Sequence, residues 1–453
     1  MKDRSLNSNH PPAGEPLDLG RRRLLQASGI GLAGLAAGSG ALLVSEPARA
    51  VQTNARIVIV GGGAAGLSAA NRLAAGLSGA RITIIEKREA HIYQPGLTLV
   101  ATGIWKQKKV LDRNERYVPS GVEWIKAMVS EFDPDANRVV TDAGEVVEYD
   151  YLMVTTGLKV DFDAIEGMST DLIGRAGIGC VYDNNDHATR TWSMIDRFAE
   201  QGGVGLFTRP AGAIKCAGAP LKITMLTEDL MQRRGTRSTA QFNYPTAGES
   251  LFSQPDMNDF LKREFPDRDI NVRWNHPLSG IEPEIRRATF DTPDGPVRLD
   301  YDFIHVVPPM RAPDPLANST LAWRSGPHAS GGWMEVDQYT MRHPRFANVF
   351  GAGDCVGTPI GKTAASVKAQ VPVAVENMIQ AIQGAEMTAS YNGYTSCPLI
   401  TGRGRGILVE FDYELAMVPS FPFISPYEEH WVPWVMKDRM LHAAYNAMMR
   451  GRV

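Results

Sequence analysis

ARIVIVGGGAAGLSAANRLAAGLSGARITIIEK, residues 55–87, is the stretch that decides the fold of this chain. The β-branched run at residues 57–60 predicts a short strand buried on both faces of a parallel sheet. The glycine-rich run at residues 61–66 leads into a helix that we predict over residues 67–73. A second strand is predicted over residues 81–85. Strand, glycine turn, helix and strand in this order are typical of a dinucleotide-binding fold.

Each small residue of the turn has a separate physical purpose. Gly61 permits the tight turn, Gly63 lets a pyrophosphate approach the backbone, and Gly66 lets the helix lie close to the strand. Ala65 lies in the glycine-rich run directly before the predicted helix, whose free N–H groups face the phosphates. A glycine-rich turn alone is common in proteins, and only the complete order makes the dinucleotide interpretation specific.

The acidic residue after the second strand completes the pattern. Glu86 comes about twenty residues after the last glycine, where a carboxylate can accept hydrogen bonds from ribose hydroxyls. Lys87 follows it directly. We therefore predict both residues at the cofactor site.

Residues 1–50 read as a targeting segment. Arginines at positions 21–23 precede a weakly hydrophobic stretch, residues 27–44, which five glycines interrupt. Ala48-Arg49-Ala50 has the small-x-small form of a cleavage site, and the mature chain would begin near Val51. Paired arginines before a weak apolar core predict export by the twin-arginine route to the periplasmic side of the cytoplasmic membrane. The alternative is a membrane anchor with a basic flank, although the stretch is short and glycine-rich for a span.

Composition agrees with a globular enzyme. The chain has 453 residues, of which 43% are hydrophobic, so it can form two or three domains. The formal net charge of −3 does not recommend nucleic acid as a partner. The four cysteines are too few and too scattered for a disulfide framework or a zinc site, and we predict no metal. They are Cys180, Cys216, Cys355 and Cys397.

Two further segments of the first domain are predicted near the cofactor. A turn-forming run at residues 91–96 contains Gln94 and should lie close to the dinucleotide. Residues 121–158 read as short strands joined by turns at 133–135 and 142–144. They end in Thr156 and Gly157, where a strand runs into a small-residue turn.

A second α/β unit is predicted over residues 174–300. Residues 203–207 form its opening strand, but no glycine fingerprint follows. The chain reads TRPAGAIKCAGAP at residues 208–220, with Cys216 where a nicotinamide domain would place its phosphate glycines. Lys215 and a helix from residue 221 would favour the Cys216 thiolate. The alternative for Cys216 is a buried structural cysteine.

The chain is then predicted to return to the first domain. Residues 301–307 read as an apolar strand of that domain. Gly353 and Asp354 follow another short strand, and Lys362 and Thr363 open a helix. Asp354 can accept a hydrogen bond from a ribityl hydroxyl. Lys362 at a helix N-terminus can stabilise negative charge on a reduced isoalloxazine. Dinucleotide elements from both ends of the domain imply FAD, and Cys355 is assigned to packing.

Several motifs together resemble one enzyme family. They are the glycine fingerprint, KCAGAP at 215–220, HVVPPM at 305–310, GDC at 353–355 with KTAA at 362–365, and SCPLITG at 396–402. On these motifs the chain resembles the sulfide:quinone oxidoreductases, in the branch that includes the mitochondrial enzymes, within the FAD-dependent pyridine nucleotide-disulfide oxidoreductase superfamily. The resemblance implies an α/β fold with two Rossmann-like domains of the glutathione-reductase type and a C-terminal membrane-facing segment.

The implied boundaries follow from that fold. They are a signal peptide at 1–50, an FAD-binding domain at 51–170 and 301–385, a second Rossmann-like domain with a redox cysteine at 171–300, and a C-terminal redox-cysteine and quinone segment at 386–453.

The resemblance also implies a mechanism. Hydrosulfide attacks a disulfide or sulfur-bridged pair, Cys216 and Cys397, and the departing sulfur leaves from Cys397. Electrons pass through FAD to a membrane quinone, ubiquinone or menaquinone. Flavocytochrome c sulfide dehydrogenases tether FAD through a cysteine in the loop after the second strand. Here that loop contains Pro95, so we expect non-covalent FAD.

Other interpretations stay open. The chain could be a flavocytochrome-type sulfide dehydrogenase, an NADH:quinone oxidoreductase, or a non-catalytic flavin-binding sulfur carrier or sensor. It could also form a homo-oligomer.

The last segment, residues 431–452, is too polar to span a membrane. As a helix it would place Trp434, Leu441, Tyr445 and Met448 in a row, and we predict peripheral membrane association through this row. An ordinary helix packed on the flavin domain is the alternative.

Overall fold

The structure is a computed structural model, and it describes residues 50–453. Its first sheet contains five parallel strands and includes both strands of the glycine-rich stretch. Both predicted strands are present. Helix α2 (Ala64–Gly76) begins three residues earlier than predicted, directly after the extended backbone of Gly63. Across the sheet the order is β22 (Val349–Gly351), β11 (Tyr151–Val154), β2 (Arg56–Val60), β4 (Arg81–Ile85) and β7 (Glu123–Ile125).

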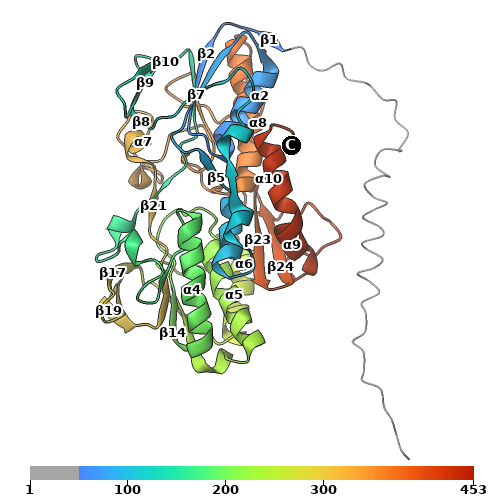
Figure 1. The fold of residues 1–453 in the computed structure, drawn as a ribbon. Helices are drawn as coiled ribbons and strands as arrows, with labels where there is room; N and C mark the ends of the chain where they lie inside the picture. The colour runs from blue at the N-terminus through green and yellow to red at the C-terminus, as the bar shows by residue number, and fades with distance from the viewer. Residues whose placement is uncertain (1–49) are drawn as a thin grey trace, which may run out of the picture. The chain divides into compact units, whose positions relative to one another are not determined.

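Two helices and a small antiparallel sheet complete the first domain. Helix α8 (Ala364–Ile382) packs against α2 beside the sheet (Figure 1). The small sheet joins its strands by the two turns predicted near residues 134 and 143. Its strands are β8 (Val129–Asp133), β9 (Arg138–Thr141) and β10 (Val146–Glu148).

The second domain repeats this plan. A five-stranded parallel sheet is accompanied by a three-stranded antiparallel sheet. The predicted opening strand is present as β14. The parallel strands, in order, are β13 (Ile178–Gly179), β20 (Phe303–His305), β14 (Gly203–Phe207), β15 (Ala240–Pro245) and β16 (Ile270–Arg273). The helices are α4 (Asn185–Gln201), α5 (Ala219–Arg234) and α6 (Pro255–Asp267), and the antiparallel strands are β17 (Leu278–Glu282), β18 (Arg287–Thr292) and β19 (Gly295–Asp300).

One predicted placement was wrong. We assigned the apolar strand at residues 301–307 to the first domain, but β20 lies inside the second sheet, between β13 and β14. Phe303 is fully buried there and stacks on Phe198 of α4. An apolar run predicts a buried strand without saying which sheet receives it. The chain crosses back only afterwards, where β21 (Met310–Arg311) pairs with the outgoing connection β12 (Lys159–Val160).

The C-terminal segment lies against both domains. Strand β23 (Thr395–Gly402) and β24 (Arg405–Phe411) form a hairpin, and β23 packs on α5. Helix α9 (Trp431–Val435) packs on β24, and a π-helical turn (Met436–Met440) leads into α10 (Leu441–Met449). Figure 1 shows α10 beside α2.

This packing contradicts the prediction that the row Trp434, Leu441, Tyr445 and Met448 faces a membrane. Tyr445 and Met448 are buried in the hydrophobic core, whereas Trp434 and Leu441 are half-buried. Tyr445 can be buried because its hydroxyl is hydrogen-bonded to the His91 ring. Within residues 50–453 we find no helix that is both long and apolar enough to cross a membrane. The export segment predicted at 1–50 lies, except for Ala50, outside the described residues.

Short elements make the remaining connections. They are β1 (Val51–Gln52), β3 (Leu77–Ser78), β5 (Ala90–Ile92), a 3₁₀ turn at Gln94–Gly96, α3 (Leu97–Ala101), β6 (Leu111–Arg113) and α7 (Asp314–Ala317).

Candidate active site

The glycine turn leaves open space where a pyrophosphate is predicted. A Cβ on Gly61 would lie 2.4 Å from the Thr155 carbonyl oxygen, and one on Gly66 would lie 1.8 Å from the Gly61 oxygen. These two glycines are therefore needed for the packing of the turn. A Cβ on Gly63 would meet no atom within 4 Å, so the space above Gly63 is available to a ligand.

Glu86 lies where the ribose-binding carboxylate is predicted. It is 4% exposed, and its carboxylate accepts hydrogen bonds from the Gly62 N–H at 2.9 Å and from Arg88. Burial opposes ionisation of Glu86, but the Arg88 guanidinium outweighs it and lowers the pKa of that carboxyl. The Arg88 side chain is 62% exposed. Lys87, by contrast, forms an exposed ion pair with Asp142.

The second glycine turn meets the first. A Cβ on Gly353 would lie 3.3 Å from Ala65, so the two turns are adjacent. Asp354 is half-buried, and its carboxylate has no hydrogen bond to any residue within 50–453. Burial raises the pKa of Asp354, against the pull of Lys215 and Lys362. A carboxylate in such surroundings is available to a ligand hydroxyl.

The Lys362 ammonium group forms its hydrogen bonds within its own loop. Its Nζ donates to the carbonyl oxygens of Asp354 at 2.7 Å and Val356 at 2.9 Å, and it lies over the Trp333 ring. Burial lowers the pKa of Lys362 to about 8. Thr363 caps α8 by accepting a hydrogen bond from the Ser366 N–H.

These residues fit an FAD molecule. Gly157, with φ +70°, follows Thr156 and also faces open space at its Cβ position. Open backbone at two turns, a buried acid at a strand end and an unbonded acid at the adjacent turn match the needs of a dinucleotide. Gly61, Gly63, Ala65, Gly66, Glu86, Thr156, Gly157, Gly353 and Asp354 would hold it.

Cys216 and Cys397 come together around one buried lysine. Cys216 is half-buried in the loop before α5, and Cys397 on β23 is 5% exposed. The Lys222 Nζ, on the second turn of α5, lies 3.2 Å from the Cys216 Sγ and 3.5 Å from the Cys397 Sγ. Lys222 is 1% exposed. Two sulfurs and a buried cation therefore form one cluster from three separate points of the chain.

The cluster favours a thiolate on Cys216. The hydrogen bond from the Cys397 thiol lowers the pKa of Cys216 well below its usual value, and Lys222 adds to this effect against the cost of burial. The same hydrogen bond, together with burial, raises the pKa of Cys397. Burial alone would lower the pKa of Lys222, but the two sulfurs raise it, so Lys222 stays protonated. The nucleophilic form of a cysteine is thereby stabilised at one defined sulfur.

Cofactor and sulfur residues are in direct contact. The Cys216 N–H donates to the Lys362 carbonyl oxygen at 2.9 Å, and the Lys215 Nζ donates to the Gln94 Oε1 at 2.6 Å. Lys437, from the π-helical turn, donates to the Pro95 carbonyl oxygen. The first domain, the Cys216 loop and the C-terminal segment thus meet at one place.

Sequence reasoning missed two lysines of this site. Lys222 and Lys437 are 1% and 3% exposed, and both act electrostatically on the two cysteines. Burial and the neighbouring Lys222 lower the pKa of Lys437 to about 7. A usable signal for Lys222 was its place inside an otherwise apolar helical stretch directly after Cys216.

The other two cysteines, Cys180 and Cys355, are buried outside the cluster around Lys222. Burial raises the pKa of Cys355 to about 11 and that of Cys180 to about 12. The Cys355 Sγ contacts the carbonyl oxygens of Val154 and Ala352. Cys355 therefore packs as expected.

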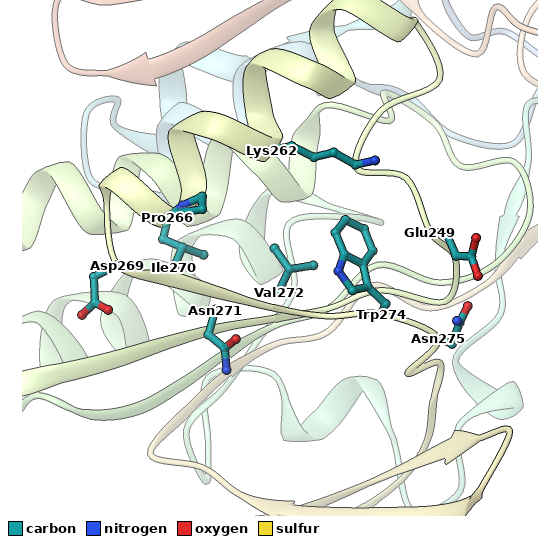
Figure 2. A pocket seen from close by; sticks show the side chains of 9 residues that line it. All are labelled: Glu249, Lys262, Pro266, Asp269, Ile270, Asn271, Val272, Trp274 and Asn275. Atoms are coloured by element: carbon teal, nitrogen blue, oxygen red, sulfur yellow. The ribbon is translucent and has the colours of Figure 1, made fainter.

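A separate groove of about 990 Å³ runs along β16 and α6 (Figure 2). Lys262 from α6 lies above Trp274, which follows β16. None of the residues predicted for cofactor or sulfur chemistry lines this groove.

Comparison with known proteins assigns the family. Residues 55–200 match the pyridine nucleotide-disulphide oxidoreductase family. The mitochondrial sulfide:quinone oxidoreductase of Dictyostelium discoideum is 36% identical over 406 residues, which cover 89% of this chain and 88% of that protein. The chain belongs to the sulfide:quinone oxidoreductase family. It is an FAD-dependent enzyme, as the cofactor geometry predicted.

Two further comparisons support this family. The mitochondrial sulfide:quinone oxidoreductase of Mus musculus is 35% identical over 398 residues, or 87% of this chain and 86% of that protein. The structure of the sulfide:quinone oxidoreductase from Aquifex aeolicus matches with a TM-score of 0.72 and 19% identity, over 88% of this chain and 92% of that one. This last similarity concerns the fold alone.

Proposed function

We propose that this chain oxidises hydrogen sulfide at the Cys216–Cys397 pair and passes the electrons through FAD to a membrane quinone. The observation that carries the proposal is the Lys222 Nζ within 3.2 Å and 3.5 Å of the two sulfurs, beside the residues that would hold FAD. Family membership supports the same substrates, because the named relatives are sulfide:quinone oxidoreductases.

The sulfur chemistry proceeds by thiol–disulfide exchange. Hydrosulfide attacks the Cys397 sulfur of the oxidised pair and forms a new S–S bond there. The bond between Cys397 and Cys216 breaks, and its electron pair leaves on Cys216 as a thiolate. A thiol or a second hydrosulfide then takes the outer sulfur from Cys397, so both cysteines are reduced. Renewed S–S bond formation releases two electrons, and a quinone takes them with two protons.

The chain's own residues prepare this exchange. Protonated Lys222 stabilises the negative charge that arrives on the Cys216 Sγ, which makes Cys216 the better leaving group. When bound, FAD accepts the two electrons of the reduced sulfur pair and delivers them to the quinone. The contact between the Cys216 N–H and Lys362 holds the sulfur loop on the cofactor-binding domain.

Anaerobic titration tests the proposal. Sulfide should bleach the flavin absorbance of the wild-type protein, and a soluble quinone should restore it. Bleaching that a cytochrome but no quinone reverses would favour a flavocytochrome-type dehydrogenase. A flavin that sulfide does not bleach would favour a sulfur carrier or sensor and would contradict the proposed function.

We also propose that the enzyme acts at the periplasmic face of the cytoplasmic membrane. The twin arginines of residues 21–23 support export, and quinones reside in the bilayer. Phe423 and Met440, which are 73% and 58% exposed, are the apolar side chains that we assign to the membrane surface.

Cell fractionation tests this location. Replacement of the three arginines by lysine should retain the protein in the cytoplasm. Phe423→Ser with Met440→Ser should move the exported protein from the membrane to the soluble fraction, while turnover with a soluble quinone stays unchanged. An unaltered distribution of either variant would contradict the corresponding part of the proposal.

A further inference from the structure

Arg268 is a buried cation that connects four segments of the chain. It lies between α6 and β16 and is 9% exposed. Its guanidinium makes contacts with three carboxylates and one main-chain carbonyl. The partners are Glu264 at 2.6 Å, Glu228 at 3.2 Å, Glu429 at 3.0 Å and the Thr401 carbonyl oxygen at 2.7 Å.

Three of these partners lie on the segments that build the sulfur cluster. Glu228 is on α5, six residues after Lys222, and Thr401 is on β23, four residues after Cys397. Glu429 precedes α9 and the π-helical turn that carries Lys437. A single guanidinium therefore links α5, β23 and the start of the C-terminal helices.

A neighbouring contact secures the same strand. Asp229, next to Glu228 on α5, accepts a hydrogen bond from the Arg403 N–H in the turn after β23 at 3.1 Å. Arg405, on β24, lies 3.5 Å from Glu429. The hairpin that carries Cys397 thus has its far end held to α5, whose first turns carry Lys222.

We propose that Arg268 is a positioning residue that holds β23 and the C-terminal segment in register on α5, and thereby keeps Cys397 and Lys437 against Cys216 and Lys222. The proposal rests on the proposed function only for the importance of the sulfur pair. The position of Cys397 relative to Cys216 is a property of the folded chain and can be measured without turnover.

The chemistry of arginine explains why this residue is needed. A planar guanidinium can donate to several acceptors in fixed directions, whereas a lysine ammonium is a compact charge on a flexible stem. Glu228 is 2% exposed, so loss of its partner leaves a buried carboxylate without full compensation. Arg268→Lys keeps the charge but cannot span α5, β23 and Glu429 at once.

Arg237 offers a matched control. It is also buried, at 8% exposed, and its Nε lies 3.8 Å from the same Glu228. Its other partners are the carbonyl oxygens of Ala240, Arg268 and Asp269, the Asp269 carboxylate and the Phe242 ring, all within the second domain. Arg237→Lys therefore disturbs the same buried charge without touching β23 or the C-terminal segment.

Thiol cross-linking of the reduced, FAD-loaded protein tests the proposal. Dibromobimane joins two nearby thiols, and mass spectrometry gives the ratio of Cys216–Cys397 cross-linked chain to singly alkylated chain. In Arg268→Lys we expect this ratio to fall at least about tenfold, and in Arg237→Lys to stay within about twofold of wild type. Thermal stability should fall in both variants.

The outcomes separate the two proposals. An unchanged ratio in Arg268→Lys, or an equal loss in Arg237→Lys, would overturn the positioning role. If Arg268→Lys yields no FAD-loaded protein, Glu429→Ala decides, because it removes one of the four partners. Its ratio should fall more than that of Arg237→Lys, and an unchanged ratio would overturn the proposal. Absence of sulfide bleaching in the wild type would refute the proposed function and leave the cross-linking comparison interpretable.

Discussion

The two five-stranded sheets share the order of four strands, β11-β2-β4-β7 in the first and β20-β14-β15-β16 in the second, but the turns after their central strands differ in what they do. In the first domain three residues, 61–63, join β2 to α2, and in the second domain eleven residues, 208–218, join β14 to α5. The first turn presents open backbone above Gly63. The second places Cys216 at a φ of +51°, a conformation that costs energy for a residue with a side chain.

The glycines of the two turns show what the difference means. Gly63 leaves space for a ligand, whereas Gly218 leaves space for another part of the protein, because a Cβ there would lie 2.6 Å from the Cys397 Sγ. The same position in the fold leaves open backbone for a ligand in one domain and brings two sulfurs to one lysine in the other. Fold position alone therefore does not determine the chemistry.

The largest effect expected from this comparison is loss of the sulfur pair. Cys216→Ser and Cys397→Ser should each retain FAD, because neither residue belongs to the first turn. Each should lower sulfide-dependent quinone reduction by at least about 10³-fold, since exchange needs both sulfurs. Steady-state assays with a soluble quinone measure this. Cys355→Ser, a buried cysteine outside the cluster, is the control and should turn over normally. Near-normal rates in either of the first two variants would contradict the mechanism.

A pair of glycine variants should separate the two turns. Gly218→Ala forces its methyl group against the Cys397 sulfur, so we expect sulfide turnover to fall about 10²-fold with FAD content unchanged. Gly63→Ala should do the reverse: a folded protein with low FAD content and an unchanged cross-linking ratio of Cys216 to Cys397. Flavin absorbance per protein and bimane cross-linking report the two effects. If both variants lost FAD equally, the proposed division between the turns would be wrong.

Local sequence patterns were sufficient to predict most of the fold. Strands at residues 57–60, 81–85 and 203–207 were predictable because an apolar β-branched run between turn residues specifies a buried strand without distant information. The strand at 301–307 was recognised but given to the wrong sheet, because its partners are set by packing with residues such as Phe198. The glycine roles followed from steric requirements that a short motif expresses directly.

The sulfur site was harder to predict from local sequence patterns. Cys216 and Cys397 are far apart in sequence, and only family resemblance suggested that they pair. Lys222 and Lys437 were missed because a lysine in a helix ordinarily indicates a solvated face, whereas here both are buried by segments remote in sequence. The segment at 431–452 is helical but is interrupted by a π-helical turn, and spacing cannot distinguish a membrane from the face of α2.

The smallest expected effect, and the one that best sharpens the comparison, concerns Lys437. The first turn offers a ligand backbone N–H groups, which do not titrate, whereas lysines lie beside the two sulfurs at the second. With the pKa of Lys437 at about 7, raising the pH through 7 removes one cation from beside Cys216. Lys437→Met should therefore raise the pKa of Cys216 and slow sulfide turnover about tenfold below pH 7, with a smaller loss above it.

Charged Lys437 should lower the stability of the folded protein, although it supports turnover. Lys437 has a pKa of about 7 in the folded protein against its ordinary value of 10.5. Below pH 7 it is charged in both states, and its burial destabilises the fold fully. Between pH 7 and 10.5 only the unfolded chain holds the proton, so the folded state becomes more stable as pH rises. Lys437→Met should remove this rise, measured as urea midpoints at pH 7 and pH 9, while Lys368→Met, at an exposed site on α8, should keep it. A wild-type midpoint that falls over this interval, or a Lys437→Met profile identical to it, would mean that Lys437 keeps its proton in the folded protein and that the titrating charge beside Cys216 lies elsewhere.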